Sequence, residues 1–251
     1  MVGTPKFVGS YQRVSGSINA GTTTASFAGG ILIESNGSAF YDLVIEGNGT
    51  TTLTGTLVAY HDLTFDEKTA GGSAINGGTL QVGRNIANAD NLGMTGTTSI
   101  NLQALGSPTT IHQNAGQFPK GNWTISTTGT VSLLSALNLS GASQNLTLST
   151  GSTAVLDMAG FDLSVGNILT LDSNTKIITG CGALTPSSGV KLVNNGSIVD
   201  GSNVNLSIND VTVNEGSDAI FTVSLSGASC KNVTLNYATS DGTAVDRKSV
   251  V

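Results

Sequence analysis

The chain has 251 residues, of which 33 are glycine, and its formal net charge is −6 with only 10% charged residues. Residues of helix interiors are sparse while Thr, Val, Ile, Gly and Asn recur throughout, which excludes all-α and most α/β folds and predicts an all-β fold with almost no helix. Apolar residues still make up 38%, enough to fold, and the ten Lys and Arg residues are too scattered for the basic face that nucleic acid requires.

The N-terminal segment, MVGTPKFVGS, lacks the charged head, apolar middle and small-residue cleavage site of a signal peptide. No apolar run approaches the ~18 to 20 residues that are needed to cross a bilayer. We therefore expect no membrane insertion in this segment of chain.

From Ser26 to Gly182, short alternating apolar segments are separated by clusters of Gly, Asn, Ser and Thr, as in ILIESNG, TTLTGTL, GGTLQVG and NLTLSTG. This rhythm predicts strands of roughly four to six residues joined by turns of two to four. In the second half of the region, the segment centres are expected to point inward; they are Leu137, Leu146, Val155, Leu163, Leu169 and Ile177.

Two architectures accommodate this rhythm. In an antiparallel sandwich, Asn-Gly pairs such as Asn76-Gly77 and Asn195-Gly196 would form type I′ hairpin turns. In a parallel β-solenoid, three short strands make one coil of ~20 to 25 residues, and Gly and Asn supply the corners with positive φ. We favour the solenoid because the pattern is too long for one sandwich and aromatic residues are only 5% of the chain.

The phrases FYDLVIEGNGTTTLTGTLVAYHDLTF, INGGTLQVGRNI and TAVLDMAGFDLSVGNILTLDSNTKIITG resemble the repeats of large bacterial surface and secreted proteins that build β-strand-repeat solenoids. The resemblance covers about 150 residues. It lies in the general pattern of the repeated phrases and not in a specific motif. It implies an exported repeat stalk, placed outside the cell or at its surface, and it implies no particular activity.

The sequence pattern changes after Gly189. We expect a solenoid over 1–189 and a second domain over 204–245. Residues 190–203 between them are expected to form a strand and a polar connector. The segment LSINDVTVNEGSDAIFTVSLSGASCKNVTLNYATSDGTA resembles the start of a Calx-β domain, a β-sandwich module of exchangers and bacterial surface proteins. Only about three strands of such a domain are present, so the sandwich is expected to be incomplete. The matching residues are Val213, Glu215, Gly216, Phe221, Val223, Leu225, Ser226, Gly227, Val233, Leu235, Tyr237, Thr239, Asp241, Gly242, Thr243 and Ala244.

The last six residues, 246–251, have the sequence DRKSVV, which is identified as the translation of a common sequencing adapter followed by a stop codon. This predicts a metagenomic reading frame that was cut at the end of a contig. A divergent natural C-terminus is the alternative.

The Calx-β resemblance implies a calcium site, with Glu215 of the N-E-G turn and Asp241 of the D-G-T-A turn as ligands and with Asp210 and Asp218 nearby. Calcium takes six to eight oxygen ligands, and the later acidic loops of the family are missing here. We therefore expect an incomplete, weak site in this chain and no resident cofactor, and calcium binding only in a complete parent protein.

Parallel β-helices also include polysaccharide lyases and hydrolases, which need clustered carboxylates. Titratable groups gather in YHDLTFDEKTA, which contains His61, Asp62, Asp66 and Glu67. We interpret this segment as a solvated loop. Asp157 and Asp162 are interpreted as residues of solvent-facing turns. The second histidine, His112, forms no catalytic or zinc-binding spacing with His61.

The two cysteines, Cys181 and Cys230, are interpreted as buried or idle thiols, because disulfide frameworks are richer in cysteine. Taken together, the sequence predicts a non-enzymatic structural and adhesive stalk of an exported bacterial surface protein, with glycans or other cell-surface polymers as expected partners. A secreted carbohydrate-active β-helix enzyme and a calcium-binding Calx-β module of an adhesin are the alternatives.

Overall fold

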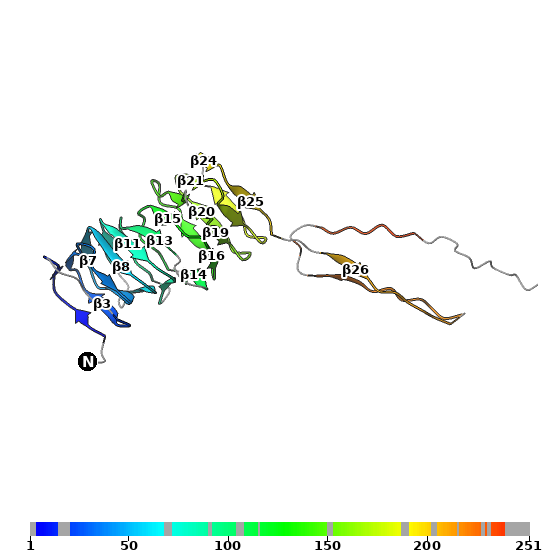
Figure 1. Ribbon diagram of the computed structural model, residues 1–251, viewed down its shortest axis with the longest axis horizontal. Helices are drawn as coiled ribbons and strands as arrows, with labels where there is room; N and C mark the ends of the chain where they lie inside the picture. The colour runs from blue at the N-terminus through cyan, green and yellow to red at the C-terminus, as the bar shows by residue number, and fades with distance from the viewer. Residues whose placement is uncertain are drawn as a thin grey trace, which may run out of the picture. The chain divides into compact units, whose positions relative to one another are not determined.

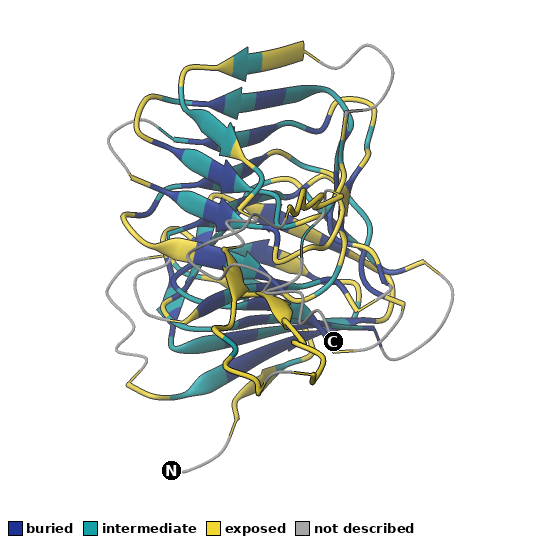
Figure 2. Ribbon diagram, turned by 90° about the vertical axis from the view of Figure 1, so that its right-hand side faces the viewer, coloured by how far each residue is buried: buried dark blue, intermediate teal, exposed yellow. Residues whose placement is uncertain are grey.

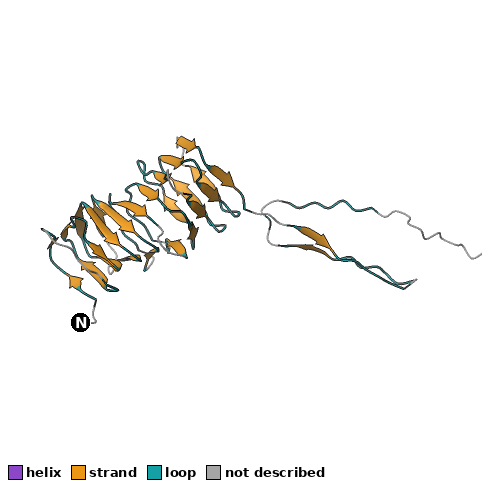
Figure 3. Ribbon diagram, in the orientation of Figure 1, coloured by secondary structure: helices purple, strands orange, loops and turns teal. Residues whose placement is uncertain are grey.

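The computed structural model describes residues 4–14, 21–67, 72–89, 92–103, 108–114, 116–149, 153–186, 191–201, 205–214, 216–226, 229 and 232–238. The chain divides into two units, Met1–Gly201 and Ser202–Val251. The described residues are all-β and contain no helix, so none of them forms a helix able to span a membrane (Figure 3).

The first unit is a parallel β-solenoid of about eight coils, as the sequence predicts (Figure 1). One side of the stack is a ten-stranded sheet, called here the first sheet. Its strands, in spatial order, are β1 (Lys6–Phe7), β3 (Thr24–Ala28), β6 (Asp42–Gly47), β9 (Leu63–Glu67), β12 (Ile86–Asn88), β14 (Thr109–His112), β16 (Thr130–Leu133), β19 (Val155–Asp157), β22 (Lys176–Ile178) and β25 (Ser197–Val199).

An eight-stranded second sheet forms another side, and every described pairing in both sheets is parallel. Its strands are β5 (Ala39–Phe40), β8 (Thr56–Ala59), β11 (Thr79–Val82), β13 (Ser99–Leu102), β15 (Trp123–Ile125), β18 (Leu146–Leu148), β21 (Ile168–Leu171) and β24 (Lys191–Asn194).

The third side is interrupted along the stack. A four-stranded sheet covers its early part, and a three-stranded sheet covers its late part. Between them, the described residues make only the isolated bridges Ala74 with Thr95 and Gly93 with Gln117. The strands are β2 (Tyr11–Gln12), β4 (Leu32–Glu34), β7 (Thr50–Thr54) and β10 (Ala74–Asn76), then β17 (Leu137–Leu139), β20 (Leu163–Val165) and β23 (Leu184–Pro186).

The core lies inside the coils and follows from the two-residue alternation of each strand. Leu80 of β11 is fully buried and pairs with Leu57 one coil before it and Ile100 one coil after it. Apolar side chains therefore stack on equivalent side chains along the whole unit, as the stripes of buried residues in Figure 2 show. Each such side chain contributes about 1.5 to 3 kcal/mol by leaving water, so every coil depends on its two neighbours.

The Asn-Gly pairs form corners between sheets and not hairpin turns. Asn76 ends β10 on the third side, and Gly77, with φ of +73°, leads into β11 on the second sheet. Gly suits this corner because a Cβ there would lie 2.8 Å from the Leu53 carbonyl oxygen of the preceding coil. The parallel solenoid is therefore correct, and the antiparallel alternative for this region is wrong.

Five of the six residues expected to point inward are buried, at 3% exposure or less: Leu137, Leu146, Leu163, Leu169 and Ile177. The prediction is wrong at Val155, which is half-buried and lies in register with Thr130 and Lys176 on the outer surface of the first sheet. Its neighbour Leu156 fills the inward position instead and is fully buried.

Pairing extends beyond the C-terminal end of the predicted solenoid. It starts at Lys6, inside the predicted range of 1–189, and continues past residue 189, where β24 pairs with β21 and β25 pairs with β22. Part of the segment expected to be a connector therefore completes the last coil. The first unit ends at Gly201, since the division between the units follows that residue.

In the second unit, β26 (Leu206–Ile208) pairs antiparallel with β27 (Val223–Leu225). All six side chains are exposed, and no second sheet covers them among the residues that the structure describes. Among the described residues of this unit the structure shows one antiparallel strand pair, which does not establish the predicted incomplete β-sandwich. Residues 246–251 lie outside the described part of the chain.

Candidate functional site

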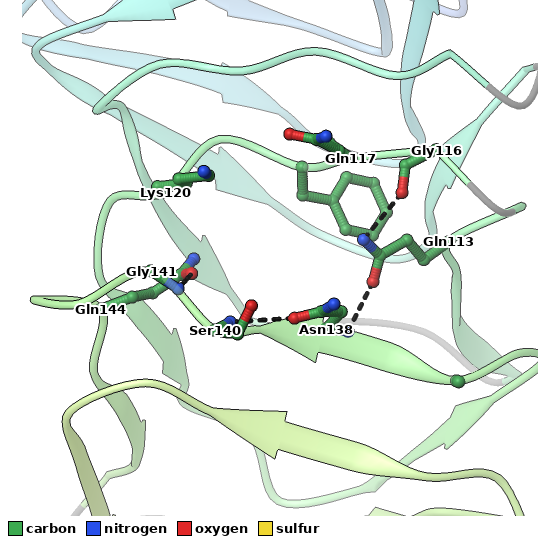
Figure 4. Close-up of a pocket in the computed structure, with 10 residues that line it drawn as sticks. Gln113, Gly116, Gln117, Lys120, Asn138, Ser140, Gly141 and Gln144 are labelled. Atoms are coloured by element: carbon green, nitrogen blue, oxygen red, sulfur yellow. Dashed lines mark hydrogen bonds between the residues drawn. The ribbon is translucent and has the colours of Figure 1, made fainter. Parts of the chain in front are cut away.

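A cavity of about 410 Å³ lies where the third side of the solenoid is interrupted, next to β17 (Figure 4). The segment 116–120 forms its upper wall and is hydrogen-bonded to the preceding coil, because the Met94 amide donates to the Gln117 carbonyl at 2.8 Å. The strand β17 forms the lower wall and, among the described strands, pairs with β20 alone. The lining residues are Gln113, Gly116, Gln117, Phe118, Lys120, Ala136, Asn138, Ser140, Gly141 and Gln144.

Two buried glutamines replace the missing strand pairing across this gap. Gln113 donates from Nε2 to the Gly116 carbonyl at 2.9 Å and accepts from the Asn138 amide at 2.6 Å. Gln144 donates from Nε2 to the carbonyls of Pro119 and Gly121, both at 3.1 Å. Both side chains are at most 6% exposed, so buried groups fix the two walls relative to each other.

Four polar side chains remain exposed around the cavity: Gln117, Lys120, Asn138 and Ser140. Asn138 accepts the Ser140 amide through Oδ1 at 3.1 Å. No described residue forms a hydrogen bond with the side-chain amide of Gln117, the ammonium group of Lys120 or the hydroxyl group of Ser140. Lys120 is the one charged residue among those lining the cavity.

Sequence reasoning assigned no role to these residues. Their signal is the loss of alternation in QNAGQFPKG, where two glycines and Pro119 interrupt the strand pattern. Such a break inside a regular repeat indicates a place where one side of the coil is not a strand. That pattern locates the gap but not the cavity, which also depends on glutamines 31 residues apart.

The structure brings two of the titratable residues of YHDLTFDEKTA together with Asp42, which the sequence did not single out. The Nδ1 atom of His61 lies 2.9 Å from Asp42 Oδ1 and 3.3 Å from Asp62 Oδ1. Tyr41 stacks on the imidazole with ring centroids 4.8 Å apart. Arg84 Nη1 donates to His61 Nε2 at 2.7 Å, so His61 acts as acceptor on that side.

The interpretation of this segment as a solvated loop is wrong for Asp66 and Glu67. Asp66 and Glu67 belong to β9, one and two residues beyond the buried Phe65. Glu67 is only 6% exposed, and its Oε1 accepts the Ser73 amide at 3.1 Å. These two carboxylates are therefore not part of the group around His61.

The carboxylates near His61 belong to a ladder of side chains that follows the stack. Asp42 Oδ1 accepts the amide of Asp62 at 3.1 Å, and Asp62 Oδ1 accepts the side-chain amide of Asn85 at 2.8 Å. Asn85 Oδ1 in turn accepts the amide of Thr110 at 2.9 Å. Each polar group thus satisfies a backbone or side-chain donor one coil away, which identifies the ladder as a structural element.

Asp42, His61 and Asp62 form the one set of His, Cys, Asp or Glu side chains among the described residues that could surround a metal ion. The ligand atoms of Asp42, His61 and Asp62 lie within 4.8 Å of one another. Arg84 brings a positive charge directly to the imidazole, and Asp42 and Asp62 already accept the hydrogen bonds of the ladder. This donor set favours a hydrogen-bonded network over a metal site.

We expect Asp62→Ala to lower the free energy of unfolding by about 1 to 2 kcal/mol, because Asn85 loses its acceptor while staying partly covered. Asp62→Asn keeps an oxygen at that position and should cost less than half as much. Urea unfolding followed by circular dichroism measures both. Equal losses for the two variants would contradict a structural role for the ladder.

The other carboxylates singled out from sequence are spread over the molecule. Asp157 accepts the Ala159 amide at 2.9 Å, and Asp162, in an exposed turn, accepts the Ala183 amide at 2.8 Å. His112 lies at the end of β14 in register with Ala87 of the first sheet. The two residues proposed as calcium ligands, Glu215 and Asp241, lie outside the described residues, whereas Asp210 and Asp218 are exposed.

The interpretation of the cysteines as buried or idle thiols is wrong for Cys181, which is disulfide-bonded. Cys181 occupies an exposed turn with φ of +86°, between β22 and β23. Cys230 lies outside the described residues.

Comparisons with protein-family models, with curated proteins and with solved structures find no match. The fold and the surface chemistry of the solenoid are therefore the basis for the proposed function.

Proposed function

We propose that this chain is a structural and adhesive segment of a large exported bacterial surface protein, with the solenoid as a stalk and no catalysis of its own. The observation that carries the proposal is the stacking of coils, in which the inner strands of the first and second sheets pair with their equivalents one coil before and after. Such a structure gains length by adding coils without a change of design, which suits a projecting stalk.

The surface of the solenoid supports the adhesive part of this proposal. The outward positions of the second sheet carry hydroxyl groups in register, with Thr124, Thr147 and Thr170 on successive strands. These groups offer hydrogen bonds without strong charge and suit glycans or other cell-surface polymers. Extracellular or cell-surface placement belongs to the same proposal.

The second unit is proposed to be the opening part of a Calx-β-like module over 204–245. The antiparallel pairing of β26 with β27 supports this, because sandwich sheets are antiparallel, unlike the solenoid. Exposed apolar side chains such as Ile208 and Phe221 are what a sandwich sheet leaves uncovered without its partner. Calcium binding through Glu215 and Asp241 remains part of the proposal for a complete module.

A secreted carbohydrate-active enzyme is the second candidate, and the cluster of Asp42, His61 and Asp62 is the observation that favours it. General acid–base catalysis needs such groups within reach of a substrate. Against it, both ring nitrogens of His61 are engaged, by Asp42 and by Arg84.

One experiment separates the two candidates. The chain is displayed on a heterologous bacterial surface, retention on dextran-coated and polygalacturonate-coated surfaces is measured, and the same polysaccharides are assayed for new reducing ends and unsaturated products. We expect retention on at least one coating and no cleavage. Cleavage that disappears in His61→Ala would overturn the proposal in favour of the enzyme, and absence of retention on both coatings would contradict the adhesive part.

A further inference from the structure

We propose that the cavity beside β17 binds a carboxylate-bearing sugar unit, such as a uronic acid residue of an acidic polysaccharide. The inference deepens the adhesive function proposed above and rests on it. It follows from three properties of the cavity: fixed walls, unused hydrogen-bonding groups and a single positive charge.

The walls are fixed before any ligand arrives. In the parallel pair of β17 and β20, the Leu137 amide donates to Asp162 and the Leu139 carbonyl accepts from Gly166, so the backbone groups of Asn138 face the other way, toward the gap. Buried Gln113 occupies the Asn138 amide at 2.6 Å. Preorganised walls reduce the entropy that binding must offset.

The gap is bridged at its other end by Gln144, whose amide holds the carbonyls of Pro119 and Gly121. The segment 116–120 is therefore tied to the coil below it by one glutamine at each end. A cavity of about 410 Å³ remains between them, within the range of small-molecule sites.

The groups left unused on these walls suit vicinal hydroxyls. The side-chain amide of Gln117 combines donors with an acceptor, and the Ser140 hydroxyl does both. Asn138 offers its Nδ2 as a donor, because its Oδ1 already accepts the Ser140 amide. All three side chains are exposed at the cavity, and Figure 4 shows Gln117 on one wall with Asn138 and Ser140 opposite. Sugar rings, whose hydroxyls also donate and accept, match this arrangement better than an apolar ligand does.

Charge selects an acidic sugar over a neutral one. The whole chain has a formal net charge of −6, yet the one charged side chain lining the cavity is the cation of Lys120. No described residue pairs with its ammonium group. A ligand carboxylate would supply the missing partner through a charge-assisted hydrogen bond.

Titration calorimetry on the full chain tests the inference with trigalacturonate as the acidic probe and maltotriose as the neutral one. We expect saturable binding of trigalacturonate that weakens with added salt. Lys120→Met should lower the affinity for trigalacturonate about tenfold, which is the loss expected for one charge-assisted hydrogen bond. The affinity for maltotriose should not change in this variant. Asn138→Leu should weaken both probes, and thermal unfolding verifies that each variant is folded.

Lys191→Met is the matched control, because Lys191 is also exposed but lies on β24, outside the cavity lining. It should leave trigalacturonate binding unchanged. Equal loss in both lysine variants would show attraction to general surface charge and overturn the inference. Absence of saturable trigalacturonate binding would also overturn it. A third contrary result would be trigalacturonate binding that Lys120→Met leaves unchanged and that an extended Ser- and Asn-rich peptide displaces.

Failure of this inference and failure of the proposed function give different results. If the displayed chain still adheres to dextran while trigalacturonate does not bind, the cavity proposal fails and adhesion resides on another face. If neither coating retains the displayed chain, the adhesive function itself fails.

Discussion

Leu156→Asp is expected to unfold the coils around β19, with a loss of more than about 4 kcal/mol, whereas Val155→Asp is expected to change stability by less than about 1 kcal/mol. Leu156 is fully buried and pairs with Val131 and Ile177 in the inner stack. An aspartate there would be an unpaired charge in an apolar interior. Far-UV circular dichroism in a urea titration measures both variants.

Val155→Asp is a stringent control because it places the same side chain one residue away. Val155 is half-buried and lies between Thr130 and Lys176 on neighbouring strands, so an aspartate gains an opposite charge one coil away. Comparable losses for the two variants, or a larger loss for Val155→Asp, would contradict the assignment of Leu156 to the inward position of β19 and Val155 to the outward one.

This pair of residues also shows where sequence reasoning reaches its limit. The run Ala154-Val155-Leu156 is apolar at three successive positions, so alternation alone does not decide which residues point inward. The stack decides, because Leu156 continues the buried series of Val131 and Ile177 while Val155 continues the outer series. A slip of one residue inverts every side chain of a strand, and only pairing between coils fixes the choice.

The parallel solenoid itself was predictable, because repeated short strands with Gly and Asn corners leave few alternatives. The boundary near Gly201 was harder to predict, since KLVNNGSIVDG differs little from a polar connector until β24 and β25 are seen to pair with the preceding coil. Polar segments at the end of a stack are stabilised by a neighbouring strand and not by their own apolar pattern.

The candidate sites depend on contacts between coils, which a single sequence does not display. His61 and Asp62 were noticeable as a titratable pair, but Asp42 lies one coil earlier and Arg84 one coil later. The cavity similarly needs Gln113 and Gln144 from successive coils to span one gap. Residues that meet in neighbouring coils are separated in sequence by one coil length, and this length varies along the chain. Sequence spacing alone therefore did not identify which residues meet.

The second large effect is expected at Trp123, the single tryptophan of the chain. Its side chain is fully buried in the second sheet, in register with Ile100 and Leu146. Trp123→Ala removes most of the side chain from a stack that cannot collapse without moving two coils, so we expect a loss of about 3 to 5 kcal/mol. Thermal and urea unfolding followed by circular dichroism measure it.

Trp123→Phe is the matched control, and the buried indole explains why it should be mild. No described group accepts a hydrogen bond from Trp123 Nε1, so phenylalanine loses volume but also removes an unsatisfied buried donor. We expect it to cost less than half of the loss in Trp123→Ala. Thr124→Ala, at the adjacent outward position, should change stability by less than about 0.5 kcal/mol.

The same substitution connects the core to the proposed binding site. The ring of Trp123 packs against Phe118, with centroids 5.3 Å apart, and Phe118 lines the cavity beside β17. Trp123→Ala removes that support from the segment 116–120, so trigalacturonate binding should weaken even at temperatures where the variant stays folded, while Trp123→Phe retains it. If folded Trp123→Ala binds trigalacturonate as the unmodified chain does, the cavity wall does not depend on the core, and rigid walls do not explain the affinity.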